Sequence, residues 1–299
     1  MTLNIRLFYS TVVPSWGFSV RYREVSAAQP SYILPPPPTV VGAFAYPLAR
    51  ILGLADTAPR ELRHGRGYIV SRNMAAFLDA AIVASAGVSG NGGLVMHQEP
   101  TKLNASMYKG SSEASRIRAE PSTRKFYDEA LPRIFPVQAV GATYTVGVEF
   151  YLTWIVDIDR LVKNFDNQGI KLTEEDIDVA GQQAVLGITR IGSKEGIVTV
   201  DPAKSGYEKN PVVKHPGENI KTVQYVPKTC VETQESIPVV DLPSVDYTLR
   251  SFYVVSTSAS NTVLLPYSIP TPGWFRVKHP CKAYSPRNGY EHLFTGVGL

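Results

Sequence analysis

The residues best suited to bind a phosphate group lie in a glycine-containing segment at 187–196. Two glycines there, Gly192 and Gly196, flank the hydroxyl of Ser193 and the ammonium of Lys194. Backbone N–H groups next to glycine, a hydroxyl and a lysine can together hold a phosphate backbone. The spacing is not that of the GxxxxGK[ST] nucleotide-binding loop. A plain connection from a helix to a strand is the alternative interpretation.

A second candidate region is the long polar segment 95–137, which is mixed in charge and poor in β-branched residues. A segment of this length between regular elements is usually functional or mobile. Arginine and lysine hold phosphates, and aromatic rings stack on splayed bases. The cations and aromatic residues in question are Lys102, Tyr108, Lys109, Arg116, Arg118, Arg124, Lys125, Phe126, Tyr127 and Arg133.

The charge of the chain is unevenly distributed around a formal net charge of +4. Residues 1–72 hold eight arginines, no lysine and three acidic residues, whereas residues 157–178 hold seven acidic residues against three cations. Arginine forks onto phosphate and stacks on bases, so the N-terminal excess favours a nucleic-acid partner. The acidic stretch would repel RNA from the opposite side. For both stretches a solvated surface is the alternative.

No metal or cofactor is expected. The five histidines and two cysteines show no metal-ligand spacing, and Asp157 and Asp159 are more simply the end of a strand. Cys230 and Cys281 are far apart in the sequence and belong to no motif. The sequence therefore predicts a protein without a metal centre, in a compartment where cysteines stay reduced, the cytoplasm.

Nothing in the sequence predicts a membrane protein. The N-terminus lacks the charged region and the apolar core of a signal peptide. The longest apolar stretch, 40–55, is interrupted by Pro47 and Arg50 and is too short to span a bilayer.

The element that must support these residues is an apolar helix preceded by four prolines, Pro35–Pro38. The prolines favour a stiff, extended entry, and Thr39 stands where an N-cap residue is expected. Gly53 stands at the expected C-cap, which gives a helix of about three to four turns. Pro47 predicts a kink inside it. The helix has almost no polar face, so it is expected to be buried, and its small residues permit close approach of a neighbour: Gly42, Ala43 and Ala45.

The remaining elements are arranged as strand, helix, strand, insertion, strand, helix and strand. A first strand includes Leu3–Tyr9, a second ends near Val88, and a third covers Tyr144–Val156. The sequence Thr173–Asp176 resembles a capping box and opens a helix that ends near Leu186. A short strand is expected at Ile197–Val200. This order is that of an α+β, ferredoxin-like βαββαβ fold.

The chain is accordingly divided into two parts. Residues 1–204 are expected to form the ferredoxin-like core with its insertion at about 95–137. Residues 205–299 are expected to form a β-rich C-terminal extension or a small second domain. The segment Trp274–Lys278 in this part is aromatic and basic, which suggests contact with nucleic acid or a partner, while core packing of Trp274 and Phe275 is the alternative.

Several of these motifs together resemble one known family. They are the segment Trp16–Arg21, the proline arm followed by a T-x-x-G-A helix that starts at Thr39, and the late loop Gly192–Gly196. The family is the RAMP subunit, known as the Cas-five family, that caps the 5′ handle of guide RNA in type I CRISPR effector complexes (Cascade). The archaeal, type I-A-like branch is the most similar, and the resemblance covers roughly residues 3–200.

The resemblance implies a non-catalytic RNA-binding subunit in antiviral defence. A ferredoxin-like core would bind the crRNA handle, and the insertion at 95–137 would form a β-hairpin thumb that reaches toward the neighbouring backbone RAMP subunit. The large subunit would be a further partner, and target DNA would be met only indirectly. The RNA-binding residues that the resemblance and the chemistry imply are Trp16, Arg21, Arg23, Tyr46, Arg50, Lys102, Tyr108, Lys109, Arg116, Arg118, Arg190, Gly192, Ser193 and Lys194.

The alternative is a metal-independent endoribonuclease that processes pre-crRNA repeats, as some type I-C relatives do with a tyrosine, a lysine and a histidine. Such a reaction needs a base for the 2′-OH proton and a cation for the charge of the phosphorane. Tyr46, His97 and Lys102 are the candidates. The insertion has no adjacent Lys-His pair, and the pairs at 214–215 and 278–279 lie outside the matched region, so the non-catalytic function is favoured. A pure assembly protein is a third hypothesis.

Overall fold

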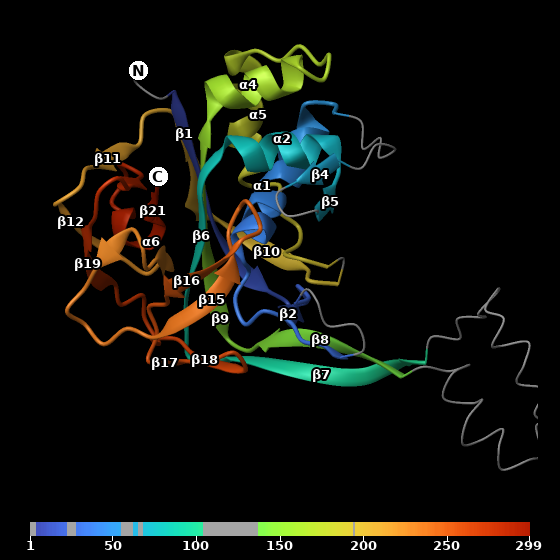
Figure 1. Cartoon of the computed structure of the whole chain (residues 1–299), viewed down its shortest axis with the longest axis vertical. Helices are drawn as coiled ribbons and strands as arrows, with labels where there is room; N and C mark the ends of the chain where they lie inside the picture. Colours follow the sequence, from blue (N-terminus) through green and yellow to red (C-terminus); the bar gives the residue numbers. More distant parts are fainter. Residues whose placement is uncertain (1–3, 23–27, 55–61, 65–67, 104–136, 194) are drawn as a thin grey trace, which may run out of the picture.

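The computed structural model describes residues 4–22, 28–54, 62–64, 68–103, 137–193 and 195–299. It is a mixed α+β structure with several antiparallel sheets, which confirms the predicted class (Figure 1). The central sheet has four antiparallel strands in the order β10 (Val198–Glu208), β1 (Ile5–Pro14), β9 (Val148–Asp157) and β6 (Ala81–Gly90). Together with helices α1 (Pro37–Ile51) and α5 (Glu174–Ala184), the chain order is β1, α1, β6, β9, α5, β10. Other helices and strands lie between these six elements in the chain, and their assignment as a ferredoxin-like core stays a prediction.

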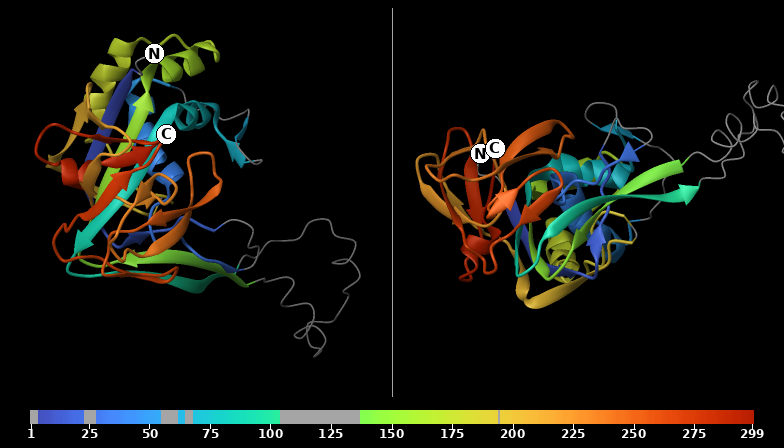
Figure 2. Two further views of the ribbon diagram at one scale, coloured as in Figure 1. Left: turned by 60° about the vertical axis from the view of Figure 1, so that its left-hand side comes forward. Right: turned by 90° about the horizontal axis from the view of Figure 1, so that it is seen from below.

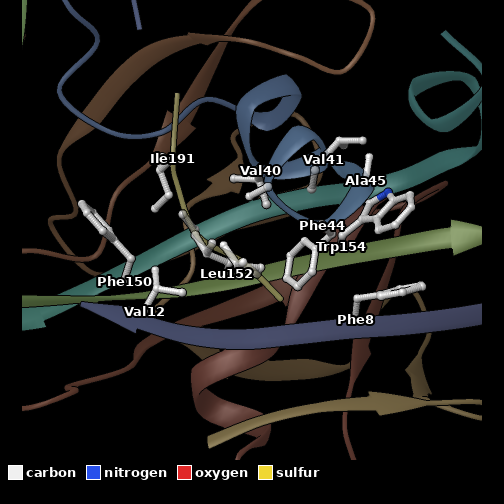
Figure 3. Close-up of a cluster of buried hydrophobic side chains, with 14 of the residues drawn as sticks. Phe8, Val12, Val40, Val41, Phe44, Ala45, Phe150, Leu152, Trp154 and Ile191 are labelled. Atoms are coloured by element: carbon white, nitrogen blue, oxygen red, sulfur yellow. The ribbon is translucent and has the colours of Figure 1, made fainter. Parts of the chain in front are cut away.

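Four helices cover one face of the central sheet: α1, α2 (Arg72–Ala80), α4 (Ile158–Asp166) and α5 (Figures 1 and 2). The core beneath them is aromatic, and the side chains of α1 lie over the ring of Trp154 (Figure 3). The ring of Trp154 lies 4.7 Å from that of Phe8 and 6.3 Å from that of Phe44, between centroids. The apolar, small-residue character of α1 is therefore explained by its burial against the sheet.

The other face of the central sheet is covered by the C-terminal third of the chain. Side chains of the sheet, among them Tyr151 and Ile155, pack against Phe294 in a second buried cluster. Gln224 is fully buried beside it and donates from Nε2 to the carbonyl oxygens of Tyr151 and Leu293, both at 2.7 Å. The sheet is thus buried on both faces, and neither face is open for bases to stack on.

The C-terminal third is β-rich, as expected. Its elements are β11 (Val212–Lys214), β12 (Asn219–Thr222), β13 (Val226–Pro227), β14 (Val231–Glu232), β15 (Val239–Pro243), β16 (Leu249–Tyr253), β17 (Ser258–Ala259), β18 (Val263–Leu265), β19 (Gly273–Val277), β20 (Lys282–Ser285), α6 (Glu291–Phe294) and β21 (Gly296–Gly298). The division of the chain at residue 204 stays a prediction.

Helix α1 begins two residues earlier than Thr39, so the predicted N-cap is wrong. The N-cap is Pro36, and Pro37 and Pro38 occupy the first helical positions, where a proline has no hydrogen bond to lose and its φ is already helical. The predicted C-cap is confirmed. Gly53 has φ +64° and donates to the carbonyl of Arg50 at 3.2 Å, and the next residue closes a Schellman motif. The kink at Pro47 stays a prediction.

Two predicted strands are more complex in the structure. The apolar, Ala-rich segment 74–88, whose middle fits a helix or a strand and for which a strand that ends near Val88 is favoured, is α2 followed by β6. Ser71 caps the helix by accepting from the N–H of Met74 at 3.2 Å. The strand predicted at 144–156 is the end of β8 (Val137–Thr145) followed by β9, and the two strands are separated by a turn and belong to different sheets. This turn contains Gly147 at φ +60°, and the alternation of apolar residues continues through the turn, which conceals it in the sequence.

Other predicted elements agree more closely with the structure. Helix α5 opens with the expected capping box between Thr173 and Asp176. Strand β10 begins near the predicted position but continues to Glu208. Between α1 and α2 the chain forms two short paired strands, β4 (Leu62–His64) and β5 (Tyr68–Val70).

Strands β7 (Leu94–Leu103) and β8 frame the predicted insertion. They pair in antiparallel fashion and extend together away from the central sheet (Figures 1 and 2). They belong to a sheet of order β17-β18-β7-β8-β2, with β2 at Gly17–Phe18 and the short β3 (Ala28–Gln29) also on β8. Residues 104–136, which join the two strands, lie outside the described residues.

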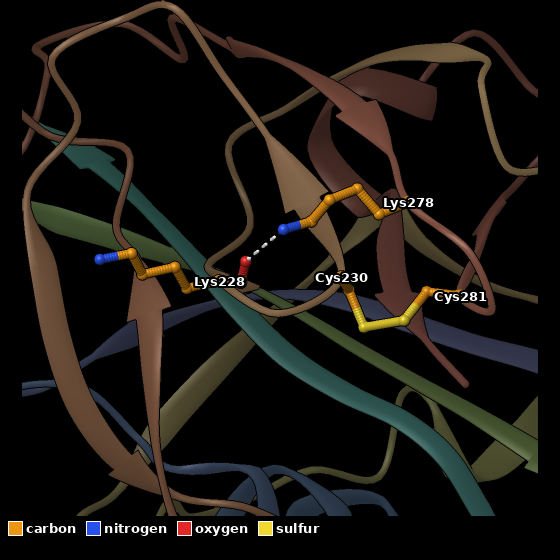
Figure 4. The surroundings of a disulfide bond; sticks show 4 residues. All are labelled: Lys228, Cys230, Lys278 and Cys281. Carbon is orange, nitrogen blue, oxygen red and sulfur yellow. Dashed lines mark hydrogen bonds between the residues drawn. A yellow bond between two sulfur atoms is a disulfide. The ribbon is translucent and has the colours of Figure 1, made fainter.

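The two cysteines form a disulfide, so the expectation that they stay reduced is wrong (Figure 4). Cys230 and Cys281 are buried, and their Cα atoms are 5.4 Å apart. The reason is the pairing of β14 with β19, in which Val231 lies opposite Val277. This pairing brings the turn before β14 next to the turn after β19, a long-range contact that a sequence separation of 51 residues does not reveal.

Candidate nucleic-acid interface

Two arginines and a tyrosine from distant parts of the chain meet at the surface of α1. Tyr46 and Arg50 are one helical turn apart, and Arg50 Nη1 donates to Tyr46 Oη at 3.3 Å. Arg190, between α5 and β10, places its guanidinium carbon 4.6 Å from the centroid of the Tyr46 ring, compared with 5.8 Å for Arg50. Both arginines are exposed and the tyrosine is half-buried. The ring thus holds two cations by cation–π attraction.

This arrangement favours an anionic ligand. Two guanidinium groups that share one aromatic ring repel each other, and a phosphate near both would relieve that repulsion. Arginine also binds phosphate oxygens through two parallel hydrogen bonds. The cluster of Tyr46, Arg50 and Arg190 is therefore suited to a nucleic-acid backbone at the edge of the molecule.

A glycine lets the chain after α5 approach α1 closely enough to form this cluster. A Cβ atom at Gly187 would lie 2.9 Å from Cβ of Pro47, closer than real Cβ atoms come to their neighbours. Helices α1 and α5 also pack directly on each other. The short distance between Arg190 and Tyr46 therefore depends on the small residue that follows α5.

The glycine loop is held by the segment that follows β2. Gly192 has φ +70°, and a Cβ atom there would lie 2.8 Å from the carbonyl oxygen of Ser19. The N–H of Ser193 donates to that same oxygen at 3.1 Å, and the N–H of Gly196 donates to Ser193 O at 3.0 Å. These two N–H groups are therefore engaged within the protein. The hydroxyl of Ser193 is buried and has no hydrogen-bond partner in the described part of the chain.

Trp16 connects this loop to the base of the β7–β8 arm. Its Nε1 donates to the carbonyl oxygen of Glu195 at 2.7 Å, and its ring lies 5.6 Å from that of Tyr144 on β8. The exposed His97 on β7 lies 6.1 Å from the same tyrosine ring. The sequence reasoning had not singled out Tyr144. Because the turn at 146–147 was not predicted, nothing in the sequence distinguished Tyr144 from the other residues of the predicted strand.

The three residues considered for catalysis do not form one contact set among the described residues. Tyr46 contacts Arg50 and Arg190, whereas the ring contact of His97 is with Tyr144. Lys102 lies five positions after His97 in the same strand, roughly 16 Å further along it at ordinary strand rise.

The other predicted RNA-binding residues are placed as follows. Arg21 is exposed and forms an isolated β-bridge with Ser31. The backbone of Lys102 pairs with that of Gln138 on the β7–β8 arm. The remaining ones lie outside the described residues: Arg23, Tyr108, Lys109, Arg116, Arg118 and Lys194.

The strongest electrostatic perturbation lies elsewhere, in a buried ion-pair network that the sequence did not reveal. Arg6 of β1 pairs with Glu174 and with Asp178 of α5, and Lys209 reaches Asp178 at 2.8 Å. Burial by itself would raise the pKa of Asp178, but hydrogen bonds from Arg6, Lys209 and Tyr207 outweigh it and lower that pKa to about 2. Burial and the hydrogen bond to Asp178 raise the pKa of the Tyr207 hydroxyl. The network connects β1, α5 and β10 and is structural.

Within the described ranges, no three His, Cys, Asp or Glu side chains gather closely enough to hold a metal ion. No described helix is long and apolar enough to cross a membrane.

Comparison with known proteins finds similarity along most of the chain. The sequence is 26% identical over 294 residues to "CRISPR-associated protein Cas5 2" of Saccharolobus solfataricus, covering 93% of this chain and 92% of the relative. The fold is similar to the crystal structure of a CRISPR protein from Archaeoglobus fulgidus, with a TM-score of 0.51, 16% identity and coverage of 98% of both chains. No protein-family model matches the chain. Both similarities extend well beyond residue 200, where the motifs that carried the resemblance end.

Proposed function

Because the chain is a Cas5-family CRISPR-associated protein, we propose that it is a non-catalytic RNA-binding subunit of a type I CRISPR effector complex (Cascade). It binds the 5′ handle of crRNA and caps the filament of backbone RAMP subunits in antiviral defence. Its other partner is the large subunit, so target DNA is met indirectly. The archaeal origin of both relatives supports the proposed type I-A-like branch, and we place the complex in the cytoplasm.

The observation that carries this proposal is the position of Arg190 and Arg50 on the ring of Tyr46. These two exposed cations come from a helix and a loop that the family resemblance had associated with the handle. Phosphate contacts of this type fix an RNA backbone without reading its sequence. Guide pairing then supplies the sequence specificity of the complex.

The covered central sheet supports binding at the edge of the molecule. Both faces of the sheet are packed, one under helices and one under C-terminal strands, so bases cannot stack on it as they do on an open RNA-recognition sheet. The surfaces that remain are α1, the loop at 187–196, Trp16 and the β7–β8 arm. We assign the four-stranded sheet with α1 and α5 as the ferredoxin-like RAMP core, and the β7–β8 arm as the base of the thumb.

The test is incubation of the purified protein with a repeat-containing guide precursor in EDTA, analysed on a denaturing gel beside a gel shift of the mature guide. We expect a shifted complex and an uncut precursor. The variant Arg50→Glu/Arg190→Glu should lose the shift by reversing both charges. The matched control is Arg160→Glu/Lys163→Glu, which reverses two exposed cations on α4 in the acidic stretch and should leave the shift intact.

Two results would contradict the proposal. An unchanged shift in the Arg50→Glu/Arg190→Glu variant would remove the tyrosine–arginine cluster from the interface. Cleavage at one position of the repeat in EDTA, lost in both Tyr46→Phe and His97→Ala, would establish the metal-independent endoribonuclease instead.

A further inference from the structure

The outer face of the sheet β12-β19-β14 carries an exposed tryptophan. Residues along β19 alternate between exposed and buried, so Trp274 and Arg276 point outward while Phe275 is 2% exposed and belongs to the core. The side chain of Trp274 is 50% exposed. Core packing, one of the two interpretations of this aromatic pair, therefore holds for Phe275 alone. Trp274 is a surface residue, and its exposure needs an explanation.

Trp274 forms one wall of a surface hollow of about 600 Å³. The other walls include Gln234, Glu235 and Glu232, together with Arg276. The register of the sheet produces this grouping, because Arg276 lies opposite both Glu232 on β14 and Asn219 on β12. An indole face and two carboxylates thus line the same hollow.

The cations near this hollow already have partners. Arg276 Nε lies 3.8 Å from Glu232 Oε1 and donates to the carbonyl of Gly217 at 3.1 Å. The ammonium of Lys221 lies over the Trp274 ring, 4.0 Å from its centroid, and Lys221 is not among the residues that line the hollow. The tryptophan is therefore shown to attract a cation on its ring.

Glu235 is the carboxylate without an ion-pair partner in the described part of the chain. Its Oε2 accepts from the backbone N–H of Trp274 at 3.2 Å, which fixes the carboxylate beside the ring. With Glu232 neutralised by Arg276, the residues that line the hollow have one negative charge left, that of Glu235, and the ammonium of Lys221 lies outside this lining, on the Trp274 ring. A cation that reaches Glu235 is attracted to its carboxylate.

We propose that this hollow binds an arginine side chain of a partner protein. A guanidinium group is planar and weakly hydrated, so it stacks on the indole of Trp274 and donates in a fork to the carboxylate of Glu235. A lysine ammonium is more strongly hydrated and cannot make the planar contact, so it binds more weakly. Arginine and tryptophan are the residues that contribute most at protein interfaces.

The arginine-binding hollow is separate from the proposed RNA interface. Strands β12 and β19 lie on the C-terminal side of the central sheet, and α1 lies on the opposite side (Figure 1). A partner protein can therefore occupy the hollow while α1 contacts RNA. The inference depends only on the geometry of the hollow and goes beyond handle binding.

The experiment follows the indole N–H resonances of the full-length protein by two-dimensional ¹H–¹⁵N NMR. The chain has three tryptophans, and the Trp274 resonance is assigned by its loss in Trp274→Phe. The probe is the capped peptide acetyl-Gly-Gly-Arg-Gly-Gly-amide, with lysine and norleucine versions for comparison. We expect a saturable shift of the Trp274 resonance with the arginine peptide, a smaller shift with lysine and none with norleucine.

Two carboxylate variants test the assignment of Glu235. Glu235→Gln keeps an oxygen that accepts from the Trp274 N–H but removes the charge, and it should weaken arginine binding about tenfold. The matched control is Glu218→Gln, because Glu218 pairs with Lys214 at 3.8 Å and does not line the hollow. This control should bind as the unmodified protein does. Unchanged Trp16 and Trp154 resonances report that each variant is folded.

Three outcomes would overturn the proposal. They are a Trp274 resonance that stays fixed up to the solubility limit of the arginine peptide, an equal shift with the norleucine peptide, and a larger shift with a single-stranded oligouridylate than with the arginine peptide. The last result would assign the hollow to nucleic acid. None of the three bears on the proposed RNA contacts of Arg190 and Arg50.

Discussion

Arg190, in the loop between α5 and β10, lies over the ring of Tyr46 in α1, with 4.6 Å between the guanidinium carbon and the ring centroid. This contact joins the two motifs that carried the family resemblance, the helix after the proline arm and the glycine loop. Strands β6 and β9 of the central sheet lie between the two motifs in the sequence, yet the motifs are neighbours in space. The contact therefore places the two motifs on one surface, and the arginines make that surface positively charged.

The salt dependence of RNA binding should report the phosphate contact of Arg190. Removal of one phosphate contact in Arg190→Ala should lower the affinity for the mature guide and reduce the slope of log K against log salt by about 0.7. The measurement is a filter-binding titration at four salt concentrations. Lys163→Ala, which removes an exposed cation from α4, should retain the original slope. Equal slopes for the Arg190 variant and the unmodified protein would show that Arg190 contacts no phosphate.

The glycine loop should tolerate a side chain poorly at Gly192. Gly192→Ala imposes both a positive φ of +70° and a Cβ atom 2.8 Å from the oxygen of Ser19, so we expect it to lower the free energy of unfolding by about 2–4 kcal/mol. Gly169→Ala is the matched control, because Gly169 has φ +79° with open space around its Cβ position. It should lower that free energy by about 1–2 kcal/mol. Urea unfolding compares the two, and equal losses would mean that the contact with Ser19 is unimportant.

The disulfide should stabilise the C-terminal third. Cys230 and Cys281 close a loop across 51 residues, and the chain-entropy estimate for a loop of that length is about 4 kcal/mol. Reduction with dithiothreitol, or the change Cys230→Ser/Cys281→Ser, should lower the free energy of unfolding by about 2–4 kcal/mol. Urea unfolding with and without reductant measures it. The double variant is its own control, since reductant should then have no effect. A reductant-insensitive unmodified protein would contradict the prediction.

The ion pair of Asp178 should make stability depend on acid pH. Its folded pKa of about 2 lies below the value of about 3.9 for an unfolded aspartate. The stabilisation, about 2 kcal/mol, is therefore fully present above about pH 4 and is lost as the pH falls from about 4 to about 2. Asp178→Asn should remove this contribution and destabilise the protein at pH 7, because the buried Arg6 then loses its buried carboxylate and keeps only the half-exposed Glu174 as an ion-pair partner.

Thermal unfolding from pH 7 to pH 2 compares this variant with Asp166→Asn, which changes an exposed aspartate at the end of α4. The control should follow the unmodified protein at every pH. If Asp178→Asn and the unmodified protein instead lost stability in parallel between pH 4 and pH 2, another carboxylate would be responsible.

The elements that the sequence predicted well are those with local signals. The capping box of Thr173 and Asp176 and the C-terminal Gly53 each act within a single turn of backbone, so residue type alone locates them. These signals, with the motifs at Thr39–Ala43 and 192–196, were sufficient for the fold class and the family.

The features that sequence reasoning missed depend on long-range pairing. The bond between Cys230 and Cys281 follows from the register of β14 on β19, and the contact of Trp16 with Tyr144 follows from the pairing of β2 with β8. The turn at 146–147 was missed because apolar alternation continues through it. The early start of α1 was missed because prolines were interpreted as an extended arm, although the first helical turn accepts them equally well.

The central sheet is covered on both faces, by helices on one and by the C-terminal third of the chain on the other, and this limits how the chain can be shortened. A fragment that ends after β10 would keep every strand of the sheet but would expose Leu7, Tyr151 and Ile155, which are at most 1% exposed in the whole chain. Such a contiguous apolar surface on a sheet is a site of aggregation in water. An expression fragment of the N-terminal two thirds is therefore expected to be insoluble, and the C-terminal strands act as a built-in solubilising layer for the sheet beneath them.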